Sequence, residues 1–303
     1  MDVRQLGDAG PKVSVVGLGC NNFGVRMDQA AVDKVVAAAL DAGITHFDTA
    51  EMYGGGKSEE FLGRALGSRR DGVVIASKFL PRPNDEPYTP GALRDRILQG
   101  CDISLGRLGT DHIDLYYQHY PDPAALVEEL RDALATLQKA GKVVHVASSN
   151  VTAEQIDEAD AAGVGFVATQ IDWSLLNRAV EEAAVPAARR HGLGVVPYFP
   201  LASGLLTGKY HRGEEFPEGT RLASSKYFAA VATDENFTYV ERLQAWAEAK
   251  GHTILELAFA WLLAQDGVAS VIAGATSTGQ VAANAAAADW VLDRAELADL
   301  PTR

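Results

Sequence analysis

The chain has 303 residues, of which 47% are hydrophobic and 22% are charged. This balance excludes disordered, collagen-like and coiled-coil proteins and is typical of a soluble globular protein. The 27 basic and 40 acidic residues give a formal net charge of −13, which disfavours binding to nucleic acid or to an anionic membrane surface.

Short β-rich runs alternate with longer amphipathic or alanine-rich stretches from one end of the chain to the other. We predict strands at 13–19, 45–49, 73–79, 113–119, 143–149, 166–171, 194–199 and 270–274. Helices are predicted to follow them, at 28–42, 58–67, 90–106, 124–140, 152–162, 180–192, 238–249 with 253–264, and 277–287. Several of the strands are apolar without alternation, which is typical of parallel strands that are buried on both faces.

Eight successive strand–helix units without a Pro-, Gly- or Ser-rich linker favour one domain over residues 1–303. The expected fold is an α/β protein, a (β/α)8 TIM barrel, rather than two doubly wound halves. Residues 3–10 read as an N-terminal β-hairpin that would close the bottom of the barrel. Residues 203–237, after the seventh strand, are too long for an ordinary connection, so we expect a lid or binding loop there.

Local signals mark several helix ends. Thr152, followed by Gln155, and Ser58, followed by two glutamates, are predicted to begin helices. Helices are predicted to stop at glycines that follow periodic stretches, namely Gly43, Gly141, Gly163 and Gly192.

Two cysteines, Cys20 and Cys101, are too few for a disulfide framework or a structural zinc site. The first residues contain no signal-peptide core, and no apolar run approaches the roughly 18 residues needed to cross a bilayer. We therefore expect a cytoplasmic protein with no membrane partner.

Titratable residues gather where the second, third and fourth predicted strands end, which is where an α/β barrel carries its active site. Lys78 shares its parity with Val74 and points into the barrel, where a lysine requires a partner carboxylate. Asp48 on the adjacent strand can supply it. The Lys78 ammonium would then favour ionisation of the nearby Tyr53 phenol, whose pKa is ordinarily about 10. His119 is expected to converge with them.

Five features in this order resemble the aldo-keto reductases over nearly the whole chain. They are residues 48–59 (DTAEMYGGGKSE), Lys78, His119, residues 170–178 (QIDWSLLNR) and residues 200–209 (PLASGLLTGK). The resemblance implies hydride transfer between NADP(H) and a small-molecule carbonyl or alcohol, without a metal. It implies that Tyr53 is the general acid/base, that Lys78 held by Asp48 tunes Tyr53, and that His119 orients the substrate oxygen.

The resemblance also implies a cofactor site. Ser149, Asn150 and Gln170 would hold the nicotinamide carboxamide, and Trp173 falls near an aromatic position that stacks on the ring. The implied cofactor contacts are Cys20, Asn21, Asp48, Ser149, Asn150, Gln170, Trp173, Tyr198, Phe199, Leu201, Ser203, Gly204, Leu205, Lys209, Arg221, Gly274, Thr276, Gln280 and Asn284. Many members have arginine where this chain has Gln280, so NAD(H) stays open beside NADP(H). The substrate pocket is expected near Phe23, Phe79 and Tyr120.

Two other functions stay open. A barrel aldolase would use Lys78 as a Schiff-base nucleophile, although a paired ammonium is a poor nucleophile. A cofactor-sensing subunit with slow turnover would be similar to the potassium-channel β-subunit branch of the family, which resembles this chain at Gln280. That branch lacks the histidine that His119 represents, so we expect a working reductase.

Overall fold

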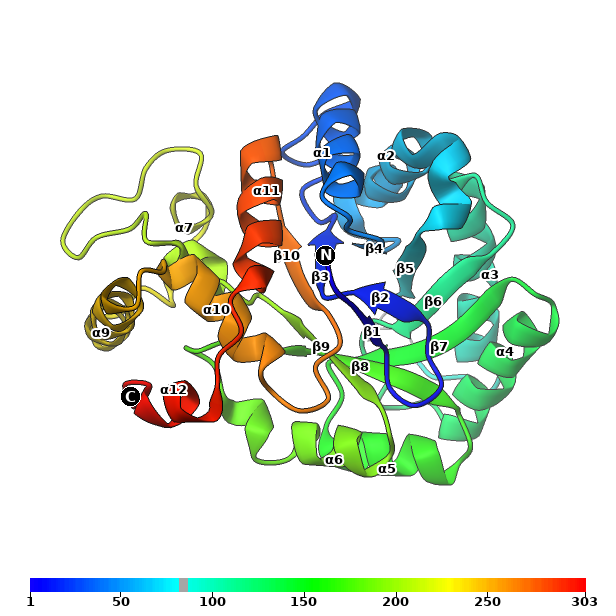
Figure 1. Cartoon of the computed structure of the whole chain (residues 1–303). Helices are drawn as coiled ribbons and strands as arrows, with labels where there is room; N and C mark the ends of the chain where they lie inside the picture. The colour runs from blue at the N-terminus through cyan, green and yellow to red at the C-terminus, as the bar shows by residue number, and fades with distance from the viewer. Residues whose placement is uncertain (82–86) are drawn as a thin grey trace.

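The computed structural model describes residues 1–81 and 87–303, and it has eight parallel strands surrounded by helices (Figure 1). The strands lie in the order β10-β3-β4-β5-β6-β7-β8-β9, and Val195 of β9 pairs with Val268 just before β10, so the sheet closes on itself. The predicted (β/α)8 barrel is confirmed. Its strands are β3 (Val16–Gly19), β4 (His46–Asp48), β5 (Val74–Phe79), β6 (Ile113–Gln118), β7 (Val143–Ser149), β8 (Phe166–Asp172), β9 (Gly194–Tyr198) and β10 (Val271–Gly274).

The helices cover the outside of the sheet (Figure 1). The longer ones are α1 (Gln29–Asp41), α2 (Lys57–Leu66), α3 (Ala92–Leu108), α4 (Val127–Lys139), α5 (Ala153–Ala161), α6 (Ala184–Arg190), α9 (Asp234–Ala249), α10 (Ile254–Leu263) and α11 (Thr278–Ala286). Within residues 1–81 and 87–303, we find no helix that combines the length and the apolar character needed to span a membrane.

Three helical regions differ from the prediction. Helix α6 is shorter than predicted and begins at Ala184, so that Pro186, which lacks an N–H, falls in its first turn. The long loop after β9 contains the short helices η4 (Ala202–Thr207), α7 (Arg221–Ser224) and α8 (Lys226–Ala229). It ends where Thr233 caps α9, and a further short helix, α12 (Arg294–Asp299), follows near the C-terminus.

The N-terminal hairpin closes one end of the barrel, as predicted. Strand β1 (Val3–Gln5) pairs antiparallel with β2 (Lys12–Ser14), so the predicted strand at 13–19 is in fact divided between the hairpin and the barrel strand β3. Leu6, next to β1, is fully buried and packs in one cluster with the inward-facing side chains Ala76, Leu115 and Tyr117. The hairpin therefore supports the strands that carry the polar residues at the opposite end.

Most of the predicted helix ends are confirmed. Thr152 and Gln155 form a reciprocal capping box at the start of α5, and the four predicted stop glycines all have positive φ. Ser58 is the exception, because α2 begins one residue earlier, after Gly56. The Ser58 hydroxyl instead donates to the carbonyl oxygen of Cys20 at 2.9 Å and lies 2.7 Å from the Thr49 hydroxyl.

We expect Leu6→Ala to lower the free energy of unfolding by about 2–5 kcal/mol, because it leaves a cavity in the closed end of the barrel. Val3→Ala in the same hairpin is the matched control. Its side chain is 54% exposed, so the change should stay within about 0.5 kcal/mol. Urea unfolding of both variants measures the difference, and equal losses would show that Leu6 does not close the barrel.

Candidate active site

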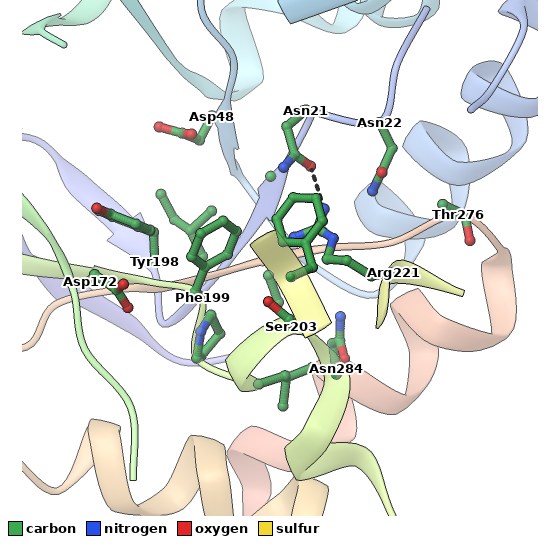
Figure 2. Close-up of a pocket in the computed structure, with 18 of the residues that line it drawn as sticks. Asn21, Asn22, Asp48, Asp172, Tyr198, Phe199, Ser203, Arg221, Thr276 and Asn284 are labelled. Carbon is green, nitrogen blue, oxygen red and sulfur yellow. Dashed lines mark hydrogen bonds between the residues drawn. The ribbon is translucent and has the colours of Figure 1, made fainter. Parts of the chain in front are cut away.

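A cavity of about 650 Å³ opens at the carboxyl ends of the strands, opposite the hairpin, and Figure 2 shows part of its wall. Its size lies within the range of small-molecule sites. Strand ends supply Asp48, Ser149, Gln170, Asp172 and Tyr198, and the connecting loops supply most of the remaining lining residues.

Asp48 and Lys78 form a buried ion pair beneath the cavity. The Lys78 Nζ donates to Asp48 Oδ1 at 2.6 Å and to the backbone oxygen of Thr49 at 2.8 Å. The side chain of Lys78 is 0% exposed, and that of Asp48 is 5% exposed. Burial lowers the pKa of Lys78, but Asp48 and Tyr53 together raise it by more, so the pKa stays above its ordinary value. Lys78 is therefore a protonated ammonium, and the expected pairing with Asp48 is present.

Tyr53 lies beside this ion pair, in the short helix η1 (Tyr53–Gly56) that follows β4. The Lys78 Nζ is 5.1 Å from the centroid of the Tyr53 ring. Burial raises the pKa of Tyr53, and Lys78 opposes that rise without reversing it. Lys78 thus acts on the pKa of Tyr53 in the predicted direction, but the burial of Tyr53 is the larger influence, so the phenol keeps its proton.

His119 faces Tyr53 across the cavity wall, directly after β6. The two rings meet edge to face with centroids 5.8 Å apart, and His119 also stacks on Tyr120 at 4.8 Å. Burial, with a smaller contribution from the Lys78 charge, lowers the pKa of His119 to about 3. The imidazole is therefore neutral at pH 7 and carries one N–H donor and one acceptor nitrogen.

A hydrogen-bond network joins the strand ends around the ion pair. Gln170 Nε2 donates to the second oxygen of Asp48 at 2.8 Å, and the Ser149 hydroxyl donates to the backbone oxygen of Gln170 at 3.1 Å. Asn150 donates to the backbone oxygen of His119 at 2.9 Å and accepts from the Tyr198 hydroxyl at 2.6 Å. Strands β4, β6, β7, β8 and β9 are thereby held in one arrangement at the cavity.

The structure brings most of the predicted site residues together. Those that line the cavity are Asn21, Asp48, Tyr53, His119, Tyr120, Ser149, Asn150, Gln170, Tyr198, Phe199, Leu201, Ser203, Gly204, Lys209, Arg221, Gly274, Thr276, Gln280 and Asn284. Lys78 lies behind this wall, in contact with Asp48 and Tyr53.

Besides Lys78, five predicted residues lie outside the cavity wall. Trp173 is buried among core residues, where its Nε1 donates to Glu181 at 2.9 Å and its ring meets Trp261 edge to face. The other four are fully buried in the layer between strands and helices: Cys20, Phe23, Phe79 and Leu205. Tyr198, rather than Trp173, presents an aromatic side chain to the cavity beside Asn150.

Sequence reasoning missed several residues of the wall. Arg26, Met52, Asp172, Tyr227 and Phe228 all line the cavity. The alternation of side chains along β8 could have identified Asp172 from the sequence. Gln170, two residues earlier, faces Asp48, so Asp172 points to the same side of the strand. Nothing in the local sequence marks Tyr227 and Phe228, since their placement depends on how the loop after β9 folds back over the barrel.

One end of the cavity carries positive charge. Arg221 lies over the rings of Phe199 and Phe228, at 5.4 and 5.1 Å from their centroids, and its guanidinium donates to Asn21 at 3.5 Å. Within the described part of the chain, Arg221, Lys209 and Arg26 have no ion pair, although all three line the cavity. A Cβ added to Gly274 would come within 3.2 Å of the Asn21 and Asn22 side chains, so the glycine keeps this end open. The residues present therefore fit an extended anionic group.

Comparison with known proteins identifies the family of the chain. Residues 15–301 match the Aldo/keto reductase family. A probable voltage-gated potassium channel subunit beta of Arabidopsis thaliana is 34% identical, over 96% of this chain and 92% of that protein. The aldo-keto reductase YhdN of Bacillus subtilis is 33% identical, over 100% and 93%. The L-glyceraldehyde 3-phosphate reductase of Escherichia coli is 31% identical, over 94% and 86%.

The chain therefore belongs to the aldo/keto reductase family, and it is an NAD(P)H-dependent oxidoreductase. Among residues 1–81 and 87–303, no three His, Cys, Asp or Glu side chains gather in a way that would hold a metal ion.

Two buried histidines predict how stability depends on pH. Burial lowers the pKa of His46, which contacts the Ser270 hydroxyl at 3.0 Å, to about 4, and lowers that of His119 to about 3, from an ordinary 6.5. Between these values the unfolded chain binds more protons than the folded protein. The stabilisation is therefore present above pH 6.5 and is lost as the pH falls, by about 2 kcal/mol for each histidine between pH 7 and pH 5.

Urea unfolding at a series of pH values measures this loss, and the exposed His211 supplies a control variant, His211→Gln, that should keep the same slope. Proton NMR of the folded protein provides a direct check. A resonance of His46 or His119 that titrates near pH 6.5 would contradict the assignment.

Proposed function

We propose that the protein reduces aldehydes or ketones to alcohols in the cytoplasm, with NADPH as the hydride donor and Tyr53 as the general acid. The observation that carries the proposal is the placement of a protonated phenol and a neutral imidazole beside a buried Asp48–Lys78 pair, within one cavity. That cavity also has an uncompensated basic end, which suits an anionic dinucleotide. The bound cofactor supplies the hydride.

Each residue of the site has a separate task in this proposal. The Tyr53 hydroxyl donates its proton to the carbonyl oxygen, and the nearby Lys78 ammonium stabilises the phenolate that remains. Asp48 keeps Lys78 charged and fixed in position. His119, neutral at working pH, orients the carbonyl oxygen through a hydrogen bond toward Tyr53. In the alcohol direction the same groups act in reverse.

The cofactor would lie along the length of the cavity. Ser149, Asn150 and Gln170 would hold the carboxamide, with Tyr198 against the ring. The residues proposed for the phosphates and the adenosine are Asn21, Phe199, Leu201, Ser203, Gly204, Lys209, Arg221, Gly274, Thr276, Gln280 and Asn284. Gln280 accepts from the backbone N–H and hydroxyl of Thr276, at 2.8 and 3.2 Å. Its amide is uncharged, so it provides no positive charge for the extra phosphate of NADPH. That charge would come from Lys209 and Arg221.

A cofactor-sensing subunit is the second candidate, because one relative is named as a probable potassium channel subunit beta. His119 and the other three catalytic residues favour turnover over sensing. Steady reduction of a simple aldehyde distinguishes the two, since a sensor would bind cofactor and cycle very slowly. The aldolase alternative requires an unprotonated Lys78, which its pairing with Asp48 opposes, and a borohydride trap of an imine would detect it.

We expect Tyr53→Phe to abolish turnover, with a loss of at least about 100-fold, because it removes the proton donor. The affinity for NADPH should stay within a few-fold, since the ring and the rest of the cavity are kept. Tyr239→Phe in α9 removes the same atom outside the cavity and should keep the rate. Steady-state reduction of an aromatic aldehyde measures both variants, and an active Tyr53→Phe would refute the mechanism.

We expect NADPH to bind more tightly than NADH, because Lys209 and Arg221 leave positive charge uncompensated at the phosphate end of the cavity. Titration of the purified protein with each cofactor, followed by quenching of tryptophan fluorescence, measures the ratio. Equal affinities would overturn the preference for NADPH while leaving the reductase assignment intact.

A further inference from the structure

Asp172 is a second carboxylate in the cavity, separate from the Asp48–Lys78 pair. It ends β8, two residues after Gln170, and it pairs in register with Tyr198 of β9. Gln170 faces Asp48, so the alternation along a strand directs Asp172 toward the cavity as well. Asp172 indeed lines the cavity and is half-buried.

No basic side chain in residues 1–81 or 87–303 forms an ion pair with Asp172. Its polar neighbour is Asn177, whose side-chain amide donates to the backbone oxygen of Asp172 at 3.4 Å. Asp48, by contrast, is neutralised by Lys78. Burial raises the pKa of the Asp172 carboxyl, and the nearby Asn177 amide, which favours the charged form, partly opposes that rise. The charge of Asp172 is thus uncompensated in the free protein, and a partly desolvated charge gains from a partner.

Asp172 lies on the side of the cavity near His119, because its register partner Tyr198 donates to Asn150, and Asn150 donates to the backbone oxygen of His119. Burial raises the pKa of the Tyr198 phenol, and the charge of Asp172 raises it further. Figure 2 shows Asp172 beside Tyr198 on one side of the view and Arg221 with Thr276 on the other. The cavity is therefore electrically polarised, with Arg221 at one end and Asp172 at the other.

We propose that Asp172 determines the charge class of the substrate. Carbonyl compounds whose remote group is positively charged or donates hydrogen bonds are favoured, and those with a carboxylate or phosphate are rejected. A carboxylate attracts a cation and repels an anion by the same Coulomb energy, and the effect is strengthened in a cavity from which water is partly excluded. This inference rests on the proposed reductase function and adds to it a residue that selects among substrates.

Three para-substituted benzaldehydes test the proposal. Para-trimethylammonio-benzaldehyde is cationic, para-tert-butylbenzaldehyde is its neutral isostere, and para-carboxybenzaldehyde is anionic. For each, kcat/KM is measured with NADPH for the wild type and for Asp172→Asn, which keeps the shape of the side chain and removes its charge. The substituents also change the reactivity of the carbonyl, but that effect is common to both proteins and cancels when their ratios are compared.

We expect the cationic-to-neutral ratio of kcat/KM to fall about tenfold in Asp172→Asn, and the anionic-to-neutral ratio to rise by a similar factor. Asp41→Asn is the control, because it removes one exposed charge at the end of α1, outside the cavity, and should leave both ratios within twofold of the wild type. Ratios that are the same in Asp172→Asn and the wild type would overturn the inference.

A binding measurement separates this inference from the reductase assignment. The affinities of the three corresponding benzyl alcohols are measured by tryptophan fluorescence, and the wild type should bind the cation most tightly and the anion least. The reductase proposal fails if no aldehyde is reduced. Asp172 still selects ligands by charge if the wild type binds the alcohols in the expected order of affinity and Asp172→Asn does not. If the aldehydes are reduced but the affinities of the three alcohols do not depend on their charge, the proposed role of Asp172 is refuted.

Discussion

The buried ion pair of Asp48 and Lys78 is the interaction on which the site depends. A lysine that is wholly removed from water is unfavourable unless a carboxylate and further acceptors replace the lost hydration. Asp48 and the backbone oxygen of Thr49 do so, and they join β4 to β5. The second oxygen of Asp48 accepts from Gln170 across the barrel, so the same carboxylate also holds β8. Removal of either charged partner would leave the other buried and unpaired, which would lower the free energy of unfolding by about 3–5 kcal/mol.

Tyr53 shows that the protonation state of the site reflects two opposed influences. Burial favours the neutral phenol, and the Lys78 ammonium favours the phenolate. Burial is the larger influence in the free protein, so the group that must donate a proton holds one before substrate arrives. The neighbouring charge still lowers the cost of the phenolate that forms when the proton leaves. Burial likewise raises the pKa of Tyr116, and there the opposing cation is Arg96.

Much of the fold and of the site was predictable because parallel strands alternate regularly between inward and outward side chains. That alternation placed Lys78 inside the barrel and identified Asp48 as its partner. The same rule, applied strictly, would have removed Phe79 and Trp173 from the pocket, since each follows an inward-facing residue and so faces the helices. Ser58 and the loop after β9 were not predictable in this way. Their conformations follow from contacts with Cys20, Thr49 and the barrel rim, which are distant in sequence.

The hairpin that closes the barrel has a consequence for the order of folding. Leu6 packs against Val167 and Val196, the Asp8 N–H donates to the Gly192 oxygen at 2.9 Å, and Arg4 donates to the Leu263 oxygen at 2.8 Å. Residues of this hairpin thus have partners that lie about 160 to 260 residues later in the chain. During translation the hairpin cannot pack in its final position until these later residues have been synthesised. Contacts of such long range slow folding, and the apolar side of the hairpin stays uncovered until the last strands emerge.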